Sequence, residues 1–280
     1  MNTLRLKSNR KSETKKVHND NKHRGSQHAT HQPGERPKKC IIFICVMITY
    51  LCSGALLVKL GLKETDQVFM IIHVVIAIVL LGIMLMTIRT TNITTERIGF
   101  RRHTRLPLIV MTIVMVLLML IDNVLPNFVQ VFHHPATILA VTLTAVMAGV
   151  FEELSCRGLL FSGLLAFSQN SRHPFISSAI WSSLIFGCLH LFNIISEGQG
   201  VEVTVQQVFY AAVIGVFFAA IRVAANGLLI PIILHSMIDF TPNITSVSSS
   251  VMDWTSLLIV FIPILVVALW GLWAEERVLK

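Results

Sequence analysis

Eight apolar stretches, each close to the length of a membrane-spanning helix, take up most of the chain after residue 39. They lie at about residues 40–62, 68–88, 106–125, 136–167, 175–195, 205–224, 227–247 and 255–273. Roughly 20 helical residues cross a hydrocarbon core of about 30 Å, and a helix satisfies its own backbone polar groups within lipid. The sequence therefore predicts an all-α, polytopic membrane helix bundle with about eight transmembrane helices. A composition of 54% hydrophobic and 14% charged residues, with a mean hydropathy of +0.70, excludes a soluble domain.

The stretch 136–167 is too long for a single crossing. We expect it either to extend past the membrane or to break near Gly158 or Gly163.

Positive charge is concentrated before the first apolar stretch. Residues 1–39 hold eleven Lys and Arg against three acidic residues, whereas the rest of the chain holds twelve of each. Such a polar segment cannot bury enough apolar surface to order itself, so we expect a disordered cytoplasmic tail. Its basic residues can also contact anionic lipids.

The distribution of Lys and Arg also predicts the orientation, because short cytoplasmic loops collect these residues. With the N-terminus inside, twenty of the 23 Lys and Arg residues are cytoplasmic, Lys59 and Lys63 are outside, and Arg157 lies within a span. Both termini are then cytoplasmic. Four parts are expected: the tail (1–39), the N-terminal transmembrane helices (40–135), a central core (136–247) that holds the ionisable residues described next, and the final transmembrane helix with a short cytoplasmic end (248–280).

Three spans carry ionisable residues that lipid does not tolerate. The stretch 136–167 holds Glu152, Glu153 and Arg157; 175–195 holds His190; and 227–247 holds His235 and Asp239. Intramembrane charges cost about 2.5 to 3.5 kcal/mol at the bilayer centre, so they face the protein interior or a wet cavity.

The spacing of these residues predicts which of them share a helix face. Glu153 and Arg157 are four apart and can pair, while Glu152 is turned about 100° away. His235 and Asp239 are also four apart, as are Phe186 and His190. Three helices that face one another would then surround a cavity with a spare carboxylate and two histidines.

Two kinds of chemistry fit such a cavity. A carboxylate beside a histidine can take a proton from water, and further donors can hold the oxyanion formed when hydroxide attacks an amide, as in a peptidase. Alternatively, Glu152, His190 and His235 could bind a divalent metal such as zinc, although no HExxH spacing is present. Cys156 allows a thiol mechanism, but a small buried hydrophobe is the simpler interpretation of this residue.

The ordered set EExxxR (Glu152, Glu153, Arg157), FxxxH (Phe186, His190) and HxxxD (His235, Asp239) resembles the CPBP family of intramembrane proteases. This family is also called the CAAX protease and bacteriocin-processing, or Abi, family. It includes type II CAAX prenyl endopeptidases and relatives of the lysostaphin resistance protein. The resemblance covers residues 136–239, about a third of the chain.

The resemblance implies a role for each motif residue. Glu152 would activate the hydrolytic water with help from His190, Glu153 and Arg157 would maintain the shape of the site, and His235 with residue 239 would stabilise the oxyanion. This sequence departs from the prenyl-substrate members, which carry Asn where Asp239 stands. A carboxylate there repels an oxyanion unless it is protonated or paired with His235.

The resulting expectation is an intramembrane endopeptidase of a bacterial cell membrane. Its expected partners are the lipid bilayer and a membrane-associated peptide or protein substrate, with no nucleic acid. The reaction would serve bacteriocin maturation or self-immunity, and prenylated substrates are not expected in a bacterial host. A non-proteolytic immunity or scaffold protein is the alternative, whereas a transporter is disfavoured because no inverted repeat is visible.

Overall fold

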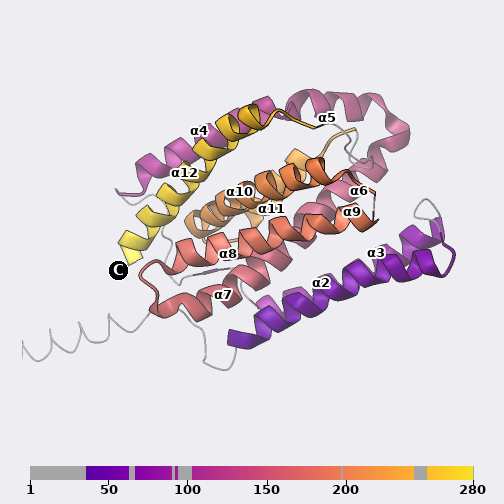
Figure 1. The fold of residues 1–280 in the computed structure, drawn as a ribbon, viewed down its shortest axis with the longest axis horizontal. Coiled ribbons are helices and arrows are strands. Elements are labelled where there is room, and N and C mark those ends of the chain that lie inside the picture. Colours follow the sequence, from indigo (N-terminus) through magenta and orange to yellow (C-terminus); the bar gives the residue numbers. More distant parts are fainter. Residues whose placement is uncertain are drawn as a thin grey trace, which may run out of the picture.

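The fold is a bundle of helices (Figure 1). This computed structural model describes residues 36–62, 67–89, 92–93, 103–196, 198–242 and 251–279. Within these ranges the regular elements are all helices and no strand occurs, so the predicted all-α class is confirmed. Most of the predicted tail lies outside the described residues, as do Lys63, Arg97, Arg101, Arg102 and Lys280.

The described helices follow one another along the chain in a fixed order. They are α2 (Arg36–Lys59), α3 (Gln67–Ile88), α4 (Arg105–Ile121), α5 (Val124–His133), α6 (Pro135–Glu152), η2 (Glu153–Leu160), α7 (Phe161–Phe167), η3 (Ser168–Asn170), α8 (Pro174–Leu189), η4 (His190–Phe192), α9 (Asn193–Ser196), α10 (Val201–Ala225), α11 (Leu229–Asp239) and α12 (Trp254–Leu279). In the described residues, six helices are long and apolar enough to cross a membrane, or seven if the bent pair α4 and α5 counts as one span. The chain is therefore a multi-pass membrane protein.

The predicted third span is not a straight helix. α4 and α5 meet at an angle of 45°, and Asn123 between them adopts a left-handed conformation with φ 54°. Asn tolerates this backbone conformation better than most residues do, which explains why the helix changes direction at this point.

The predicted fourth span does not break at either glycine. α6, η2, α7 and η3 form one helical run over residues Thr137–Asn170. An added Cβ at Gly163 would collide with Cys40 of α2, and one at Gly158 would lie 2.5 Å from Ile88 of α3. Of the two expected outcomes, the break at a glycine is thus wrong, because the glycines allow α2 and α3 to approach closely; the extension past the membrane stays a prediction.

The predicted seventh span is represented by a short helix. α11 has only 11 residues, which gives a length of roughly 16 Å, about half the thickness of a hydrocarbon core. The remainder of that predicted span, from residue 243, lies outside the described residues.

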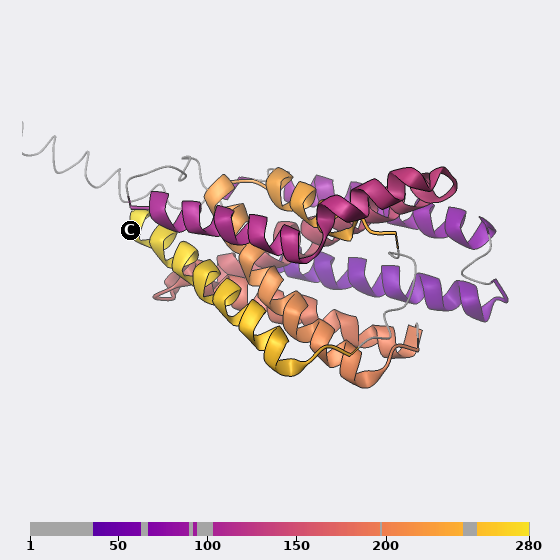
Figure 2. The ribbon, with the colours of Figure 1, turned by 90° about the horizontal axis from the view of Figure 1, so that it is seen from above.

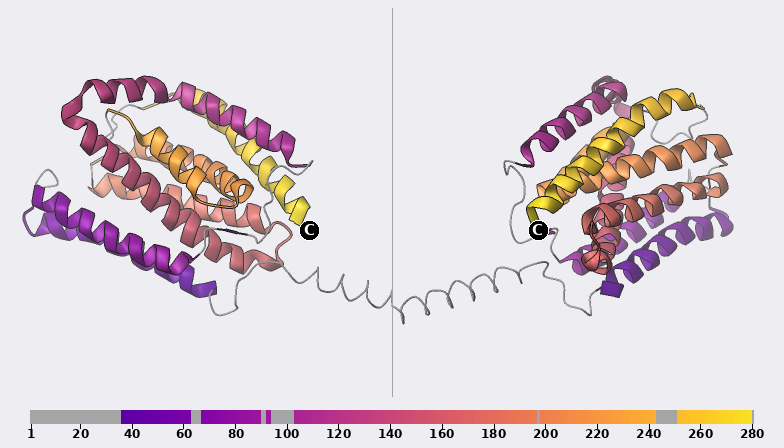
Figure 3. Two further views of the ribbon diagram at one scale, coloured as in Figure 1. Left: turned by 180° about the vertical axis from the view of Figure 1, so that it is seen from behind. Right: turned by 60° about the vertical axis from the view of Figure 1, so that its left-hand side comes forward.

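Three hydrophobic clusters lie in the described part of the bundle, and two of them are large. The first joins α8, α10 and α12, around fully buried residues such as Phe217, Leu257 and Leu272, and α4 packs on its α12 side (Figure 2). The second joins the α2/α3 hairpin to η2 and α7 on the opposite flank (Figure 1). Helices α6 and α11 run side by side (Figure 3), and at Gly149 even one methyl group would collide with Ser236.

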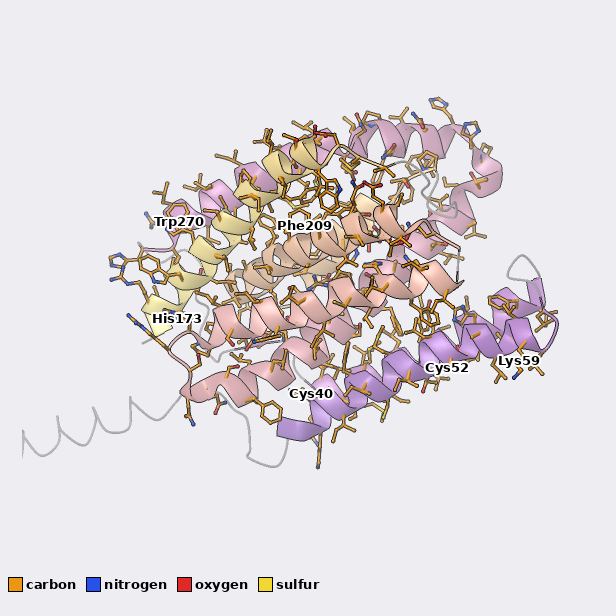
Figure 4. All side chains as sticks on the ribbon, in the orientation of Figure 1. Cys40, Cys52, Lys59, His173, Phe209 and Trp270 are labelled. Atoms are coloured by element: carbon orange, nitrogen blue, oxygen red, sulfur yellow. The ribbon has the colours of Figure 1, made fainter. Side chains whose placement is uncertain are left out.

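The described ends of the chain lie toward the same end of the bundle. α2 begins and α12 ends on the left of Figure 1, and Figure 4 places His173 at that end and Lys59 at the other. This arrangement agrees with an even number of crossings. The side of the membrane that each end faces stays a prediction.

Candidate active site

A π-helix carries the first motif. Residues Glu153–Leu160 form this widened helix directly after α6, and all eight of them are buried. π-helical turns are rare and are frequently found at functional sites. The EExxxR motif therefore spans the junction at which an ordinary α-helix becomes a π-helix.

Glu153 is the centre of a buried polar contact between two helices. One of its carboxylate oxygens, Oε1, lies 2.9 Å from Nη1 of Arg157 and 2.8 Å from Nδ1 of His235 on α11. Glu153 and Arg157 are 0% and 1% exposed, respectively. The predicted pairing of Glu153 with Arg157 is thus present, and His235 joins the pair from a distant part of the chain.

The Arg157 guanidinium lies among aromatic rings. It stands 4.7 Å from the ring centre of Phe186 on α8 and 5.7 Å from that of Phe218 on α10. Phe218 also packs against His235, with ring centres 5.4 Å apart. These contacts suit a cation that has left water, because an aromatic face attracts positive charge.

Glu152 points away from its neighbour, as the helical spacing predicts. Its side chain is 32% exposed, and its Oε2 lies 3.5 Å from Nε2 of His235. Asp239 is 29% exposed, and its Oδ2 is also 3.5 Å from the same nitrogen. His235 therefore bridges a buried carboxylate at Nδ1 and two accessible carboxylates at Nε2.

His190 lies at the edge of this group. It follows the last residue of α8, and its ring meets Phe186 edge to face at 5.2 Å. The same Phe186 ring lies against the Arg157 guanidinium. Within the described ranges, no hydrogen bond or ion pair links His190 to Glu152, so the structure places it near the site without a direct polar contact.

The polar residues of the candidate site form two groups, one buried and one accessible. Glu153 and Arg157 are sealed from solvent, whereas Glu152, His235 and Asp239 offer polar atoms on the exposed side. With Nδ1 donating to Glu153, the proton on Nε2 decides whether His235 donates or accepts toward Glu152 and Asp239. The accessible part can thus hold a water molecule beside a carboxylate and offer an imidazole donor to a developing negative charge.

The predicted metal ligands are not gathered into one group in the described residues. In the part of the chain that the structure describes, no group of three or more His, Cys, Asp or Glu side chains could hold a metal ion. No hydrogen bond or ion pair in the described ranges joins His190 to Glu152 or His235, whereas Nε2 of His235 faces Glu152 and Asp239 at 3.5 Å each. The zinc set of Glu152, His190 and His235 is thus not assembled in the described residues, and a metal requirement stays a prediction.

Cys156 does not face the site. It is 1% exposed and packs in the hydrophobic cluster with α2 and α3 residues such as Phe43 and Met84. This position agrees with a small buried hydrophobe. Phe218, by contrast, touches both Arg157 and His235 but carries no signal in the sequence, because it is one of many apolar residues in its helix.

Comparison with known proteins places all six candidate site residues in one matched region. Residues 134–241 match the family model described as "Type II CAAX prenyl endopeptidase Rce1-like". No curated protein and no solved structure matches the chain. The match covers the segment with Glu152, Glu153, Arg157, His190, His235 and Asp239, and it confirms that this segment is similar to the CAAX protease family of membrane-embedded endopeptidases.

Proposed function

We propose that this chain is an intramembrane endopeptidase in which Glu152 activates water to hydrolyse a peptide bond of a membrane-associated peptide or protein. The family match supports an endopeptidase of the CAAX type. The observation that supports the role of Glu152 is the unequal burial of two adjacent glutamates. Glu153 is sealed in contacts with Arg157 and His235, while Glu152 keeps an accessible carboxylate.

The chemistry follows from these positions. The ionised Glu152 carboxylate removes a proton from a water molecule, and the water oxygen bonds to the carbonyl carbon of the substrate. The carbonyl electron pair moves to oxygen, and the resulting oxyanion accepts a hydrogen bond from Nε2–H of His235. When the C–N bond breaks, the proton held by Glu152 passes to the leaving amine.

Glu153 acts on this reaction through His235. Its contact with Nδ1 fixes the ring orientation and directs Nε2 toward the accessible carboxylates. The oxyanion and an ionised Asp239 would both lie beside Nε2 of His235 and would repel each other. Asp239 must therefore be protonated, or share the proton of Nε2, when the oxyanion forms. In this proposal His190, whose ring packs on the same Phe186 that contacts Arg157, assists Glu152 by holding the water.

The proposal is tested by comparing wild type with Glu152→Gln. The exchange is nearly isosteric and removes the base, so cleavage is expected to fall by a factor of about 100 or more. Purified protein in lipid bicelles is assayed with a fluorogenic farnesylated peptide that ends in a CAAX sequence, and with the same peptide without the prenyl group. In parallel, membrane and secreted peptides of expressing cells are compared by mass spectrometry.

Glu202→Gln is the matched control, because it removes an exposed carboxylate at the start of α10, outside the site. It is expected to behave as wild type. Peptide ends that appear with wild type alone name the substrate, and a secreted peptide among them would indicate bacteriocin maturation. Cleavage by Glu152→Gln at the wild-type rate contradicts the mechanism, and inactivity of every folded variant, wild type included, favours a non-proteolytic immunity or scaffold role.

A further inference from the structure

The α2/α3 hairpin brings two polar aromatic residues up to the candidate site from outside the family-matched segment. Tyr50 of α2 and His73 of α3 stack with ring centres 4.7 Å apart and an angle of 18° between the rings. On its other side, Tyr50 meets Phe151 at 4.5 Å. Phe151 directly precedes Glu152, so the stack ends beside the residue proposed to activate water.

The position of Tyr50 along its helix is unusual for a membrane tyrosine. Tyrosines gather at membrane interfaces, where the hydroxyl reaches water. Tyr50 instead lies near the middle of the predicted span 40–62, two residues before Cys52, which Figure 4 marks along α2. A phenol at this depth requires a polar neighbour, and the contact with Phe151 brings Tyr50 to the turn of the helix that carries Glu152.

His73 supports the same interpretation. It is the one ionisable residue in α3, and Phe69 of the same helix meets its ring edge to face at 5.6 Å. Its ring also lies 3.9 Å from the position that a Cβ would take at Gly54 of α2. Among the residues that the structure describes, the buried Nε2 of His73 has no hydrogen-bond partner. Burying a polar ring among apolar helices costs free energy unless the ring makes a hydrogen bond to a neighbouring group or to a water molecule.

We propose that Tyr50 is a positioning residue for Glu152: its hydroxyl donates a hydrogen bond to the Glu152 carboxylate or to the water beside it, and His73 holds the Tyr50 ring in place. The inference rests on the proposed role of Glu152. It means that the hairpin, which packs on η2 and α7, completes the site rather than only anchoring the protein. A phenylalanine at position 50 would fill the same space and keep the stack, so the hydroxyl is what the proposal requires.

The test compares wild type, Tyr50→Phe and Ser53→Ala in lipid bicelles. Ser53→Ala is the matched control, because it also removes a hydroxyl from α2. The Ser53 hydroxyl donates its hydrogen bond to the backbone carbonyl of Tyr50. Cleavage of the farnesylated CAAX peptide gives kcat and KM. A second readout needs no substrate: a hydrophobic carbodiimide labels Glu152, mass spectrometry locates the label, and the labelling rate is followed against pH.

For Tyr50→Phe, kcat is expected to fall about tenfold with KM unchanged, as for the loss of one hydrogen bond to a charged group. The pH profile of Glu152 labelling shifts by roughly half a unit or more, because a hydrogen bond distinguishes the two protonation states. Ser53→Ala matches wild type in both. His73→Phe, which keeps a ring but no Nε2, gives changes in the same direction as Tyr50→Phe but smaller.

The two proposals fail in different ways. If Glu152→Gln cleaves the probe like wild type, the proposed function fails, and the labelling profile still tests the contact of Tyr50 with Glu152. If Glu152→Gln is inactive while Tyr50→Phe equals wild type in kcat and in its labelling profile, the inference on Tyr50 alone is overturned. A purely structural role for Tyr50 would lower the thermal stability of Tyr50→Phe and leave the labelling profile unchanged.

Discussion

Replacing Glu153 by Gln is expected to destabilise the protein strongly, because it leaves a buried cation without its counter-ion. Arg157 is 1% exposed, and its Nη1 lies 2.9 Å from Glu153. Removing one partner of a buried ion pair costs about 3–5 kcal/mol. The rings of Phe186 and Phe218 still attract the guanidinium, so we expect the lower end of this range. The free energy of unfolding should fall by about 3 kcal/mol, which raises the unfolding constant roughly a hundredfold.

The double variant Glu153→Met with Arg157→Leu separates stability from catalysis. Replacing a whole buried ion pair by apolar side chains is often neutral or stabilising, so the double variant is expected to recover most of the lost stability. It should nevertheless remain inactive, because His235 loses the carboxylate that orients Nδ1. Stability and activity would then change independently in the same site.

Unfolding in mixed micelles with a rising fraction of sodium dodecyl sulfate, followed by tryptophan fluorescence, gives the free energies. The single and double variants are compared with wild type and with Glu202→Gln. A loss below about 1 kcal/mol for Glu153→Gln, or a double variant less stable than the single one, would refute the reasoning.

Three further predictions concern the packing and capping of the helices. Gly149→Val forces α6 away from Ser236 on α11, so activity should fall severalfold or more in protein that still inserts into the membrane, as measured by cleavage in bicelles. Glu276→Ala leaves the backbone N–H groups of Phe175 and Ile176, 2.6 and 3.1 Å from that carboxylate, without their acceptor, and the free energy of unfolding should fall by about 1–3 kcal/mol. Asp253 accepts hydrogen bonds from Ser256, which lower its pKa. Asp253→Ala should therefore lower the melting temperature at neutral pH, and the difference should vanish as the pH falls through the lowered pKa, where the wild-type carboxylate is protonated.

Contacts within one helix could be predicted from the sequence. The pairing of Glu153 with Arg157 and the approach of His235 to Asp239 both follow from a spacing of four residues. The same holds for the edge-to-face contact of Phe186 with His190. Helical geometry alone places such neighbours on one face.

Contacts between helices could not be predicted in the same way. The bond of His235 to Glu153 joins residues 82 positions apart, and nothing in the local sequence indicates which faces of α6, η2 and α11 meet. The π-helix has no clear sequence signal either, since ELSCRGLL reads equally well as ordinary α-helix. The bend at Asn123 escapes detection because the apolar character continues on both sides of it.

The carboxylate of Glu276 has a consequence for the order in which the protein matures. It lies in the last turns of α12, yet it satisfies the first backbone N–H groups of α8, a helix that carries Phe186 and leads into His190. The ribosome synthesises α12 after every other described helix. Until then, the first backbone N–H groups of α8 lack their carboxylate acceptor, although the other described helices have been synthesised. Full capping of α8 therefore depends on α12, and a chain interrupted before α12 would leave these N–H groups without their acceptor.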